Sequence, residues 1–250
     1  MSKYSKEFIK AISRWQMGSK NKSKKAKTLK KEIKACKLES PFNVYKGDCF
    51  RKIDLTDNSV YELGTSLKLK EQLSSWTNSI DIAKTFKKGP SRELISCIIC
   101  HKPSKEEVVL NLHALYSDPN FVKAIAECSN HEIKGIMKYW NSQKEIILEL
   151  DLVPITEICS LGGHIGTPEE IAEIKNEEEF KPLALTVEIV MDGLKKNGFN
   201  IGDDWWLSRE GTQSVIYRTL MKGQQRGIIP SAINIDVFSS KRSNPILLSF

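Results

Sequence analysis

The chain has no long apolar run, and this absence excludes a membrane-spanning helix of the usual kind. None of its segments approaches the about 20 consecutive apolar residues that cross a bilayer. The opening residues, Met-Ser-Lys-Tyr-Ser-Lys, are not followed by the apolar core of a signal peptide. No glycine-rich segment continues into Gly-Lys-Ser/Thr, which excludes the usual phosphate-binding loop. We therefore expect a cytoplasmic protein with no membrane partner.

Cysteines are few and scattered, and they give no metal pattern. The 250 residues contain six of them: Cys36, Cys49, Cys97, Cys100, Cys128 and Cys159. The run Cys97-Ile-Ile-Cys100-His101 has the spacing of a covalent haem attachment site. An extended strand, however, points its two cysteines to opposite faces, and no second ligand pair lies at zinc spacing. We expect reduced, buried thiols and no metal.

The charge is strongly positive and unevenly spread. The formal net charge is +7, and residues 20–37 hold nine lysines and a single acid, Glu32. Such a stretch favours an acidic partner, either a nucleic acid or a protein associated with one. A solvated lysine-rich helix has the same pattern, so that alternative stays open. No arginine or aromatic residue is interleaved there, so base stacking has no platform.

The composition predicts a globular α+β protein. Hydrophobic residues make up 40% and charged residues 28% of the chain, which suits one large domain or two modest ones. Helical periodicity predicts an amphipathic helix over 5–16 and a second helix with the apolar stripe Leu29, Ile33 and Cys36. The expected parts are basic N-terminal helices (1–40), an α+β core (41–162) and a mainly helical region of unknown role (163–250).

The C-terminal region carries weaker signals. The glycine-rich run at 161–166 predicts a hinge, and helices are expected at 183–194 and 214–221. The acids and indoles of Asp203-Asp204-Trp205-Trp206 form either a ligand site or a packing corner, and we favour the packing corner.

The segment 145–150 is apolar enough to be a buried strand, and a carboxylate heads it. Glu145 follows Gln143 by two residues and Trp140 by five. Strand alternation predicts that Gln143 and Glu145 share one face. A charge that opens a buried strand is costly unless it is paired or used. The alternative is a solvated glutamate at a polar strand end.

Two upstream stretches supply a cation and a hydroxyl. The run 42–47 predicts a short strand that carries Lys46, and the run 65–77 predicts a strand on which Ser75 and Thr77 point the same way. The second strand leads directly into a helical pattern over 80–86. Arg51, five residues after Lys46, is a substitute cation outside the motif.

A cation strand, a hydroxyl strand and a Gln-x-Glu strand, in this order, resemble the mono-ADP-ribosyltransferases of the Arg–Ser–Glu class over roughly residues 43–150. The resemblance implies a split, mixed β-sheet, NAD as substrate, no metal, and a macromolecular acceptor, most simply a protein. Lys46 stands where the family usually has arginine. Small basic transferases of this kind occur in tailed bacteriophages, where they modify host proteins, which would place this chain in a host cytoplasm.

The resemblance also implies residue roles. Glu145 would stabilise the ribosyl cation, Ser75 would orient Glu145, and Lys46 would neutralise the diphosphate. Gln143 would face the acceptor; relatives that resemble the clostridial Rho-modifying exoenzymes carry glutamine there, which disfavours an arginine acceptor. Further cofactor contacts are implied for Tyr45, Gly47, Thr77, Phe86 and Arg92, and substrate contacts for Tyr139 and Trp140.

Two other functions fit the same pattern. An inactivated transferase fold would serve as a nucleic-acid- or protein-binding module, and lysine in place of arginine at residue 46 favours this reading. An NAD glycohydrolase would use water in place of the acceptor.

Overall fold

The computed structural model describes residues 3–18, 21–54, 66–69, 71–91, 96–154, 157–164, 202–227 and 231. Its strands are β1 (Cys49–Asp54), β2 (Ser66–Lys68), β3 (Leu73–Thr77), β4 (Ser96–His101), β5 (Val108–Asn111), β6 (Glu145–Glu149), β7 (Leu152–Pro154), β8 (Ile158–His164) and β9 (Asp204–Trp206). Its helices are α1 (Lys6–Gln16), α2 (Lys22–Cys36), α3 (Ile80–Thr85), α4 (Leu112–Leu115), α5 (Pro119–Ala126), α6 (Lys134–Tyr139) and α9 (Arg209–Gln225).

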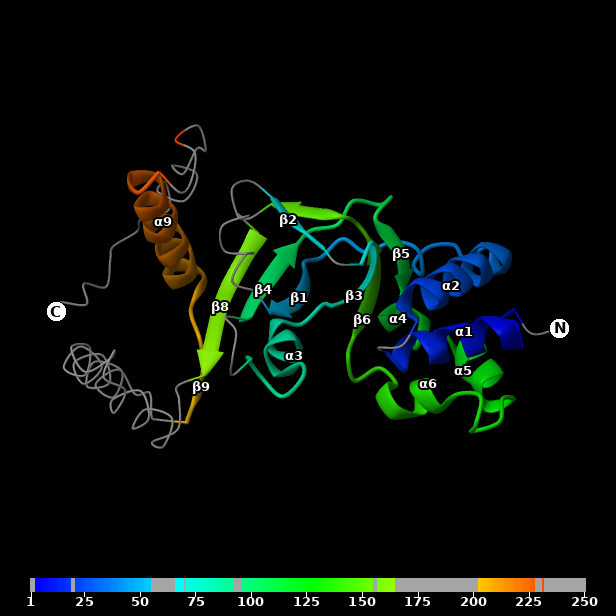
Figure 1. Ribbon diagram of the computed structural model, residues 1–250. Coiled ribbons are helices and arrows are strands. Elements are labelled where there is room, and N and C mark those ends of the chain that lie inside the picture. Colours follow the sequence, from blue (N-terminus) through cyan, green and yellow to red (C-terminus); the bar gives the residue numbers. More distant parts are fainter. Residues whose placement is uncertain are drawn as a thin grey trace. The chain divides into compact units, whose positions relative to one another are not determined.

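The α+β class is confirmed. Seven strands form a sheet in the order β5-β6-β3-β1-β4-β8-β9, and β2 pairs with β7 in a second sheet (Figure 1). The described strand pairs are antiparallel, so the sheet differs from the mixed sheet that the family resemblance implies. Among the described helices, none is both long and apolar enough to cross a membrane.

The chain divides into two compact units that interleave along the sequence. The first comprises Met1–Arg51, Ser66–Ala83 and Cys100–Val153, and the second comprises Lys52–Thr65, Lys84–Ile99 and Pro154–Phe250. The strands with Ser75 and Glu145, and the helices α1 and α2, belong to the first unit.

Helix α1 lies at the centre of the helical layer of the first unit. It packs against α2, α5 and α6 (Figure 1). Ser5 caps its first turn by accepting a hydrogen bond from the backbone of Phe8 at 3.1 Å. The apolar face that the sequence predicts for 5–16 is buried in the main core of the unit, together with Leu110 and Ile147 of the sheet. Both expected N-terminal helices are therefore confirmed.

The contact of α1 with α6 depends on one glycine. A Cβ atom on Gly135 would lie 2.0 Å from the carbonyl oxygen of Ser13, so only glycine fits at this crossing. The hydroxyl of Ser13 also accepts a hydrogen bond from the backbone N–H of Gly135 at 3.0 Å. These contacts fix the C-terminal half of α1 against α6.

The predicted strand over 42–47 is wrong, because a neighbouring asparagine holds this segment in a loop. The side-chain amide of Asn111 donates to the carbonyl of Val44 at 3.0 Å, and its backbone N–H donates to the carbonyl of Phe42 at 2.7 Å. These carbonyls are thus unavailable to a sheet ladder. The strand begins instead at Cys49 and carries Arg51.

In the second unit, the expected hinge at 161–166 is wrong where it is described, since β8 extends through His164. Two glycines of β8 leave room for two indoles of β9: Gly162 faces Trp206, and Gly163 faces Trp205. The two indoles of 203–206 therefore pack against β8, as the packing-corner prediction expects, whereas Asp203 and Asp204 are exposed.

The helix expected at 214–221 is confirmed within α9, whereas the helix expected at 183–194 lies outside the described residues.

Candidate active site

The register of β3 and β6 brings Ser75 and Glu145 to one face of the sheet. Thr77 lies opposite Glu145, and Ser75 lies opposite Ile147. Ser75 and Glu145 are therefore diagonal neighbours, a position from which side chains can touch. The hydroxyl of Ser75 donates a hydrogen bond to Oε1 of Glu145. The sequence prediction that these two side chains meet agrees with this geometry.

The last turn of α1 closes over the carboxylate. The indole N–H of Trp15 lies 2.9 Å from Oε1 of Glu145 and 3.1 Å from Oγ of Ser75. Nε2 of Gln16 donates to Oε2 of Glu145 at 3.2 Å. Glu145 is only 4% exposed, so the carboxylate is enclosed and both of its oxygens accept hydrogen bonds.

A tyrosine extends this network away from the sheet. The hydroxyl of Tyr116 donates to Oε1 of Gln16 at 2.9 Å, which directs the amide N–H₂ of Gln16 toward Glu145. The ring centroid of Tyr116 lies 5.0 Å from that of Trp140. Trp140 is 40% exposed, so this aromatic pair leads from the carboxylate network to the surface.

Burial is the main influence on the pKa values of Glu145 and Tyr116. Burial raises the pKa of Glu145 above its usual value, and the hydrogen bonds from Ser75, Trp15 and Gln16 oppose this shift. Burial also raises the pKa of Tyr116, the negative charge of Glu145 raises it further, and the hydrogen bond with Gln16 opposes the shift. Tyr116 therefore stays protonated and keeps its donor role at neutral pH.

Arg51 is the cation that the structure brings to this network. Its Nη1 donates to the backbone carbonyl of Ser75 at 3.1 Å, and its Nη2 lies 2.9 Å from Oε2 of Glu71. Lys22 shares Glu71, at 2.5 Å from the other carboxylate oxygen. The Nε of Arg51 is buried and has no hydrogen-bond partner among the described residues. Burial lowers the pKa of Arg51, and Glu71 opposes this shift.

The structure does not bring Lys46 to the cation position that the motif assigns to it. Lys46 is exposed and lies in the loop before β1. In the same loop, Gly47 lies beneath Tyr45, because a Cβ atom on Gly47 would approach the Tyr45 hydroxyl to 2.7 Å. Among the described residues, the side chains that hydrogen-bond Glu145 are those of Ser75, Trp15 and Gln16, and it is Arg51 rather than Lys46 that contacts the backbone of Ser75.

The turn before β6 overturns the predicted alternation of Gln143 and Glu145. Lys144 has a positive φ of 44°, which breaks the extended geometry, and the strand begins only at Glu145. Gln143 is half-buried in that turn, next to the half-buried Tyr139 and the exposed Trp140.

The remaining predicted residues lie in three different surroundings. Thr77 is buried, and its hydroxyl accepts a hydrogen bond from the backbone of Ser79 at 3.2 Å. Phe86 is 43% exposed and belongs to the second unit. Arg92 lies outside the described residues.

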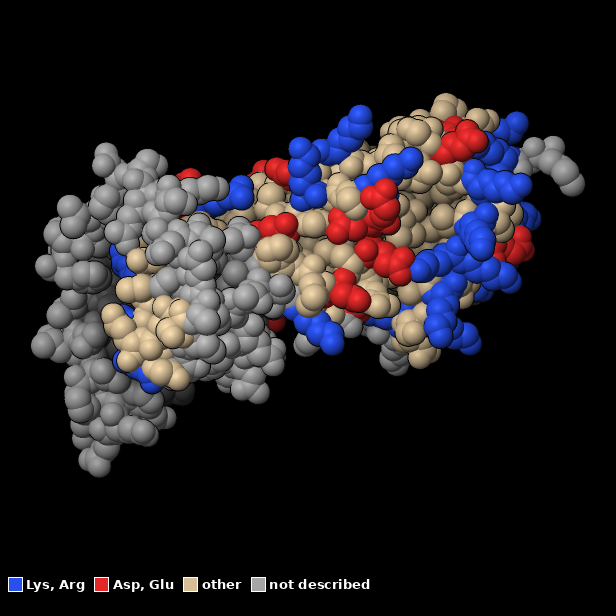
Figure 2. Space-filling model, turned by 90° about the horizontal axis from the view of Figure 1, so that it is seen from above, with Lys and Arg blue, Asp and Glu red and all other residues tan. Residues whose placement is uncertain are grey.

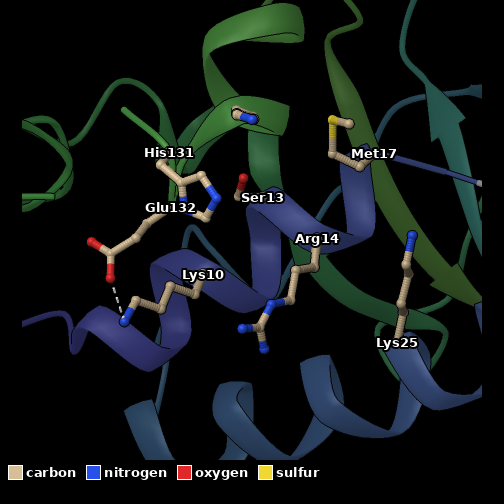
Figure 3. A pocket seen from close by; sticks show the side chains of 8 residues that line it. Lys10, Ser13, Arg14, Met17, Lys25, His131 and Glu132 are labelled. Carbon is tan, nitrogen blue, oxygen red and sulfur yellow. Dashed lines mark ion pairs between the residues drawn. The ribbon is translucent and has the colours of Figure 1, made fainter. Parts of the chain in front are cut away.

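A cavity of about 370 Å³ lies elsewhere in the first unit, beside α1 (Figure 3). Its lining is mostly basic: Lys10, Ser13, Arg14, Met17, Lys25, His131, Glu132 and Lys134. Two of its lysines have partners, because Lys10 lies 2.6 Å from Glu132 and Lys25 donates to the carbonyl of Gly18 at 2.5 Å. Neither Ser75 nor Glu145 lines it, so it is separate from the carboxylate network.

Sequence reasoning missed Trp15, Gln16 and Tyr116, which all contribute to the surroundings of Glu145. The available signal was the end of the amphipathic helix, where an indole and an amide follow the apolar stripe.

Comparison of the chain with protein-family models, with curated proteins and with solved structures finds no match.

Proposed function

We propose that the protein is an NAD-dependent mono-ADP-ribosyltransferase that acts on a macromolecular acceptor, with Glu145 as its central carboxylate. The observation that carries this proposal is the hydrogen bond from Ser75 to Glu145 on adjacent strands. Arg51, on the next strand of the sheet, contacts the backbone of Ser75. A cation, a hydroxyl and a carboxylate thus follow one another across β1, β3 and β6, in the order of the sequence motif.

The chemistry requires a fixed negative charge next to the ribose of NAD. When the bond between the ribose carbon and the nicotinamide nitrogen breaks, the electron pair leaves with nicotinamide and the ribose becomes an oxocarbenium-like cation. The carboxylate of Glu145 stabilises that developing charge. The hydroxyl of Ser75 holds one oxygen of the carboxylate in place, and the acceptor nucleophile then attacks the ribose carbon.

Arg51 takes the role of the diphosphate cation in this proposal, in place of Lys46. A guanidinium binds phosphate oxygens with a planar pair of donors, whereas an ammonium acts as a point charge. Within the described part of the chain, the buried Nε of Arg51 has no hydrogen-bond partner, so the residue keeps an unused donor. Glu71 balances its charge and shares that task with Lys22.

Access to Glu145 involves the last turn of α1. Trp15 and Gln16 occupy positions that a ribose hydroxyl would need, because they donate to the two carboxylate oxygens. Binding of NAD therefore has to replace these two hydrogen bonds. This requirement makes α1 part of the proposed reaction.

The acceptor is assigned to the side of Gln143 and Trp140. An amide at residue 143 hydrogen-bonds amides and hydroxyls but is a poor base for a guanidinium. Trp140 is exposed next to it and offers an apolar contact to a protein acceptor. We therefore propose a protein acceptor that is not modified on arginine.

The second candidate is a binding module on a transferase-like scaffold, and the burial of Glu145 favours it. A carboxylate that is 4% exposed and hydrogen-bonded by Trp15, Gln16 and Ser75 can act purely as an anchor for α1. In that case Glu145 contributes to the fold and not to chemistry.

The deciding experiment is incubation of the full chain with NAD labelled in its adenylate part and a bacterial lysate. Label on a macromolecule, lost in Glu145→Gln, supports the transferase. Release of nicotinamide without labelled macromolecules indicates a glycohydrolase. Glu149→Gln is the matched control, because Glu149 lies on the same strand at the surface and pairs with Lys30. No reaction of NAD with the folded wild type leaves only the binding module.

A further inference from the structure

Helix α2 carries lysines on two distinct faces. One face makes ion pairs: Lys22 lies 2.5 Å from Glu71, which precedes β3, and Lys30 lies 2.6 Å from Glu149 of β6. These two lysines have a structural partner on the first unit. The carboxylates of Glu71 and Glu149 therefore neutralise the charge of these two lysines.

The other face consists of four lysines without such partners. Lys24, Lys27, Lys31 and Lys34 follow at intervals of three, four and three residues, so they form one stripe along the helix. All four are exposed, and in the part of the chain that the structure describes none of their side chains has an ion pair or hydrogen bond. At about 1.5 Å per residue the stripe is about 15 Å long. Figure 2 shows lysine and arginine side chains gathered over this part of the first unit.

This stripe opposes the stability of its own helix. Like charges three and four residues apart repel, and lysines near a helix N-terminus face the positive end of the helix dipole. The first turn has no acid, and the cap residue Asn21 makes no side-chain hydrogen bond. Only Leu29 is fully buried. A helix that keeps these repelling lysines, with no contact of their side chains to offset the repulsion among the described residues, indicates that the charge has a function.

We infer that the stripe Lys24–Lys27–Lys31–Lys34 binds the phosphate backbone of a nucleic acid duplex without reading its sequence. A protein partner is disfavoured, because lysine is depleted from protein interfaces and this face offers no aromatic or large apolar anchor. Arginine is also absent from α2, which removes bidentate readout of bases, and no aromatic residue offers a stacking platform. Four flexible ammonium groups in a row suit phosphate contacts alone.

The test uses the full chain without NAD, so its result does not depend on the proposed transferase activity. A fluorescently labelled DNA duplex of about 30 base pairs is titrated at several salt concentrations, and the slope of log affinity against log salt is measured. Two double variants remove the same charge from the same helix: Lys27→Gln/Lys31→Gln on the stripe and Lys22→Gln/Lys30→Gln on the paired face. Thermal unfolding of both variants confirms that they fold.

The stripe variant should lower the salt slope by about 2, since each phosphate contact contributes about 0.9, and the paired-face variant should leave it unchanged. Three results would overturn the inference. The first is an equal loss in both variants, which would indicate net charge alone. The second is the absence of duplex binding by the wild type at low salt. The third is competition by polyglutamate as strong as that by unlabelled duplex, which would indicate an acidic polypeptide as the partner.

Discussion

Nε2 of Gln16 lies 3.2 Å from Oε2 of Glu145, although the two residues are 129 positions apart in the chain. Both groups are buried, and this contact ties the N-terminal helix to the strand that holds the carboxylate. Under the transferase proposal the bond must open for NAD, and under the binding-module alternative it is a permanent part of the fold. The predictions below separate these roles.

Glu145→Gln should abolish the reaction with NAD and leave the fold intact. The amide keeps the shape of the side chain but loses the charge that stabilises the ribosyl cation, so we expect a loss of about two orders of magnitude or more. The surrounding donors can adapt, because Gln16 can turn its amide and accept from the new side chain while it donates to Tyr116. Nicotinamide release and circular dichroism measure the two effects. Glu145→Gln activity close to that of Glu149→Gln would place the reaction elsewhere.

The stability of the wild type relative to Glu145→Gln should fall as the pH rises. Burial raises the folded-state pKa of Glu145 above its unfolded value of about 4.3, so the folded protein holds the proton more tightly. The stabilisation is complete below the unfolded pKa and is lost as the pH rises through the folded pKa. Urea denaturation of both proteins across this range gives the difference in unfolding free energy, in which other titrating groups cancel. A difference that grows with pH would mean that the hydrogen bonds outweigh burial.

Gln16→Leu should destabilise the protein, because it leaves Glu145 short of a donor and Tyr116 without its acceptor. Unpaired buried polar groups of this kind cost about 1–3 kcal/mol each. The double variant Gln16→Leu/Tyr116→Phe should lose less unfolding free energy than the two single variants lose together, because both changes remove the same hydrogen bond. Chemical denaturation of the four proteins in this cycle measures the coupling. Strict additivity would show that Tyr116 and Gln16 do not act together.

Arg51→Gln should weaken NAD binding, and Lys46→Gln should not. Both changes remove one positive charge, but Arg51 lies beside Ser75 whereas Lys46 is exposed in a loop. Loss of a charged hydrogen bond is worth about 1.5–3 kcal/mol, or about a tenfold to hundredfold loss of affinity. Calorimetric titration with NAD at equal ionic strength measures both variants. A larger effect from Lys46→Gln would return the diphosphate to the position that the sequence motif predicts.

Parts of the fold and site that depend on local pattern were predictable from the sequence. The strands with Ser75 and Glu145 have strong β propensity, and the helix over 5–16 has strong helical periodicity. The failed predictions have two different causes, one outside the predicted segment and one within it. The run 42–47 has strand propensity, but Asn111 captures its carbonyls, and a positive φ at Lys144 separates Gln143 from its strand.

The residues that enclose Glu145 could not be found from the sequence. Trp15 and Gln16 reach the carboxylate from a helix that packs closely on α6 through Ser13 and Gly135, and this contact joins residues that are 122 positions apart. No periodicity within α1 encodes that distance. An indole and an amide at a helix end are as consistent with a solvated terminus as with a buried network.

Gly135→Ala should therefore affect both stability and the site. The new Cβ atom would lie 2.0 Å from the backbone oxygen of Ser13, so α1 has to move, and we expect a cost of about 1–3 kcal/mol. Gly211→Ala is the matched control, because its nearest neighbour is the Ser208 hydroxyl at 3.4 Å and alanine is the better helix former. Denaturation of both variants tests this contrast.

If displacement of α1 admits NAD, nicotinamide release per folded molecule should rise in Gly135→Ala and not in Gly211→Ala. A fall in Gly135→Ala, with the fold retained, would mean that Trp15 and Gln16 hold Glu145 in its reactive position.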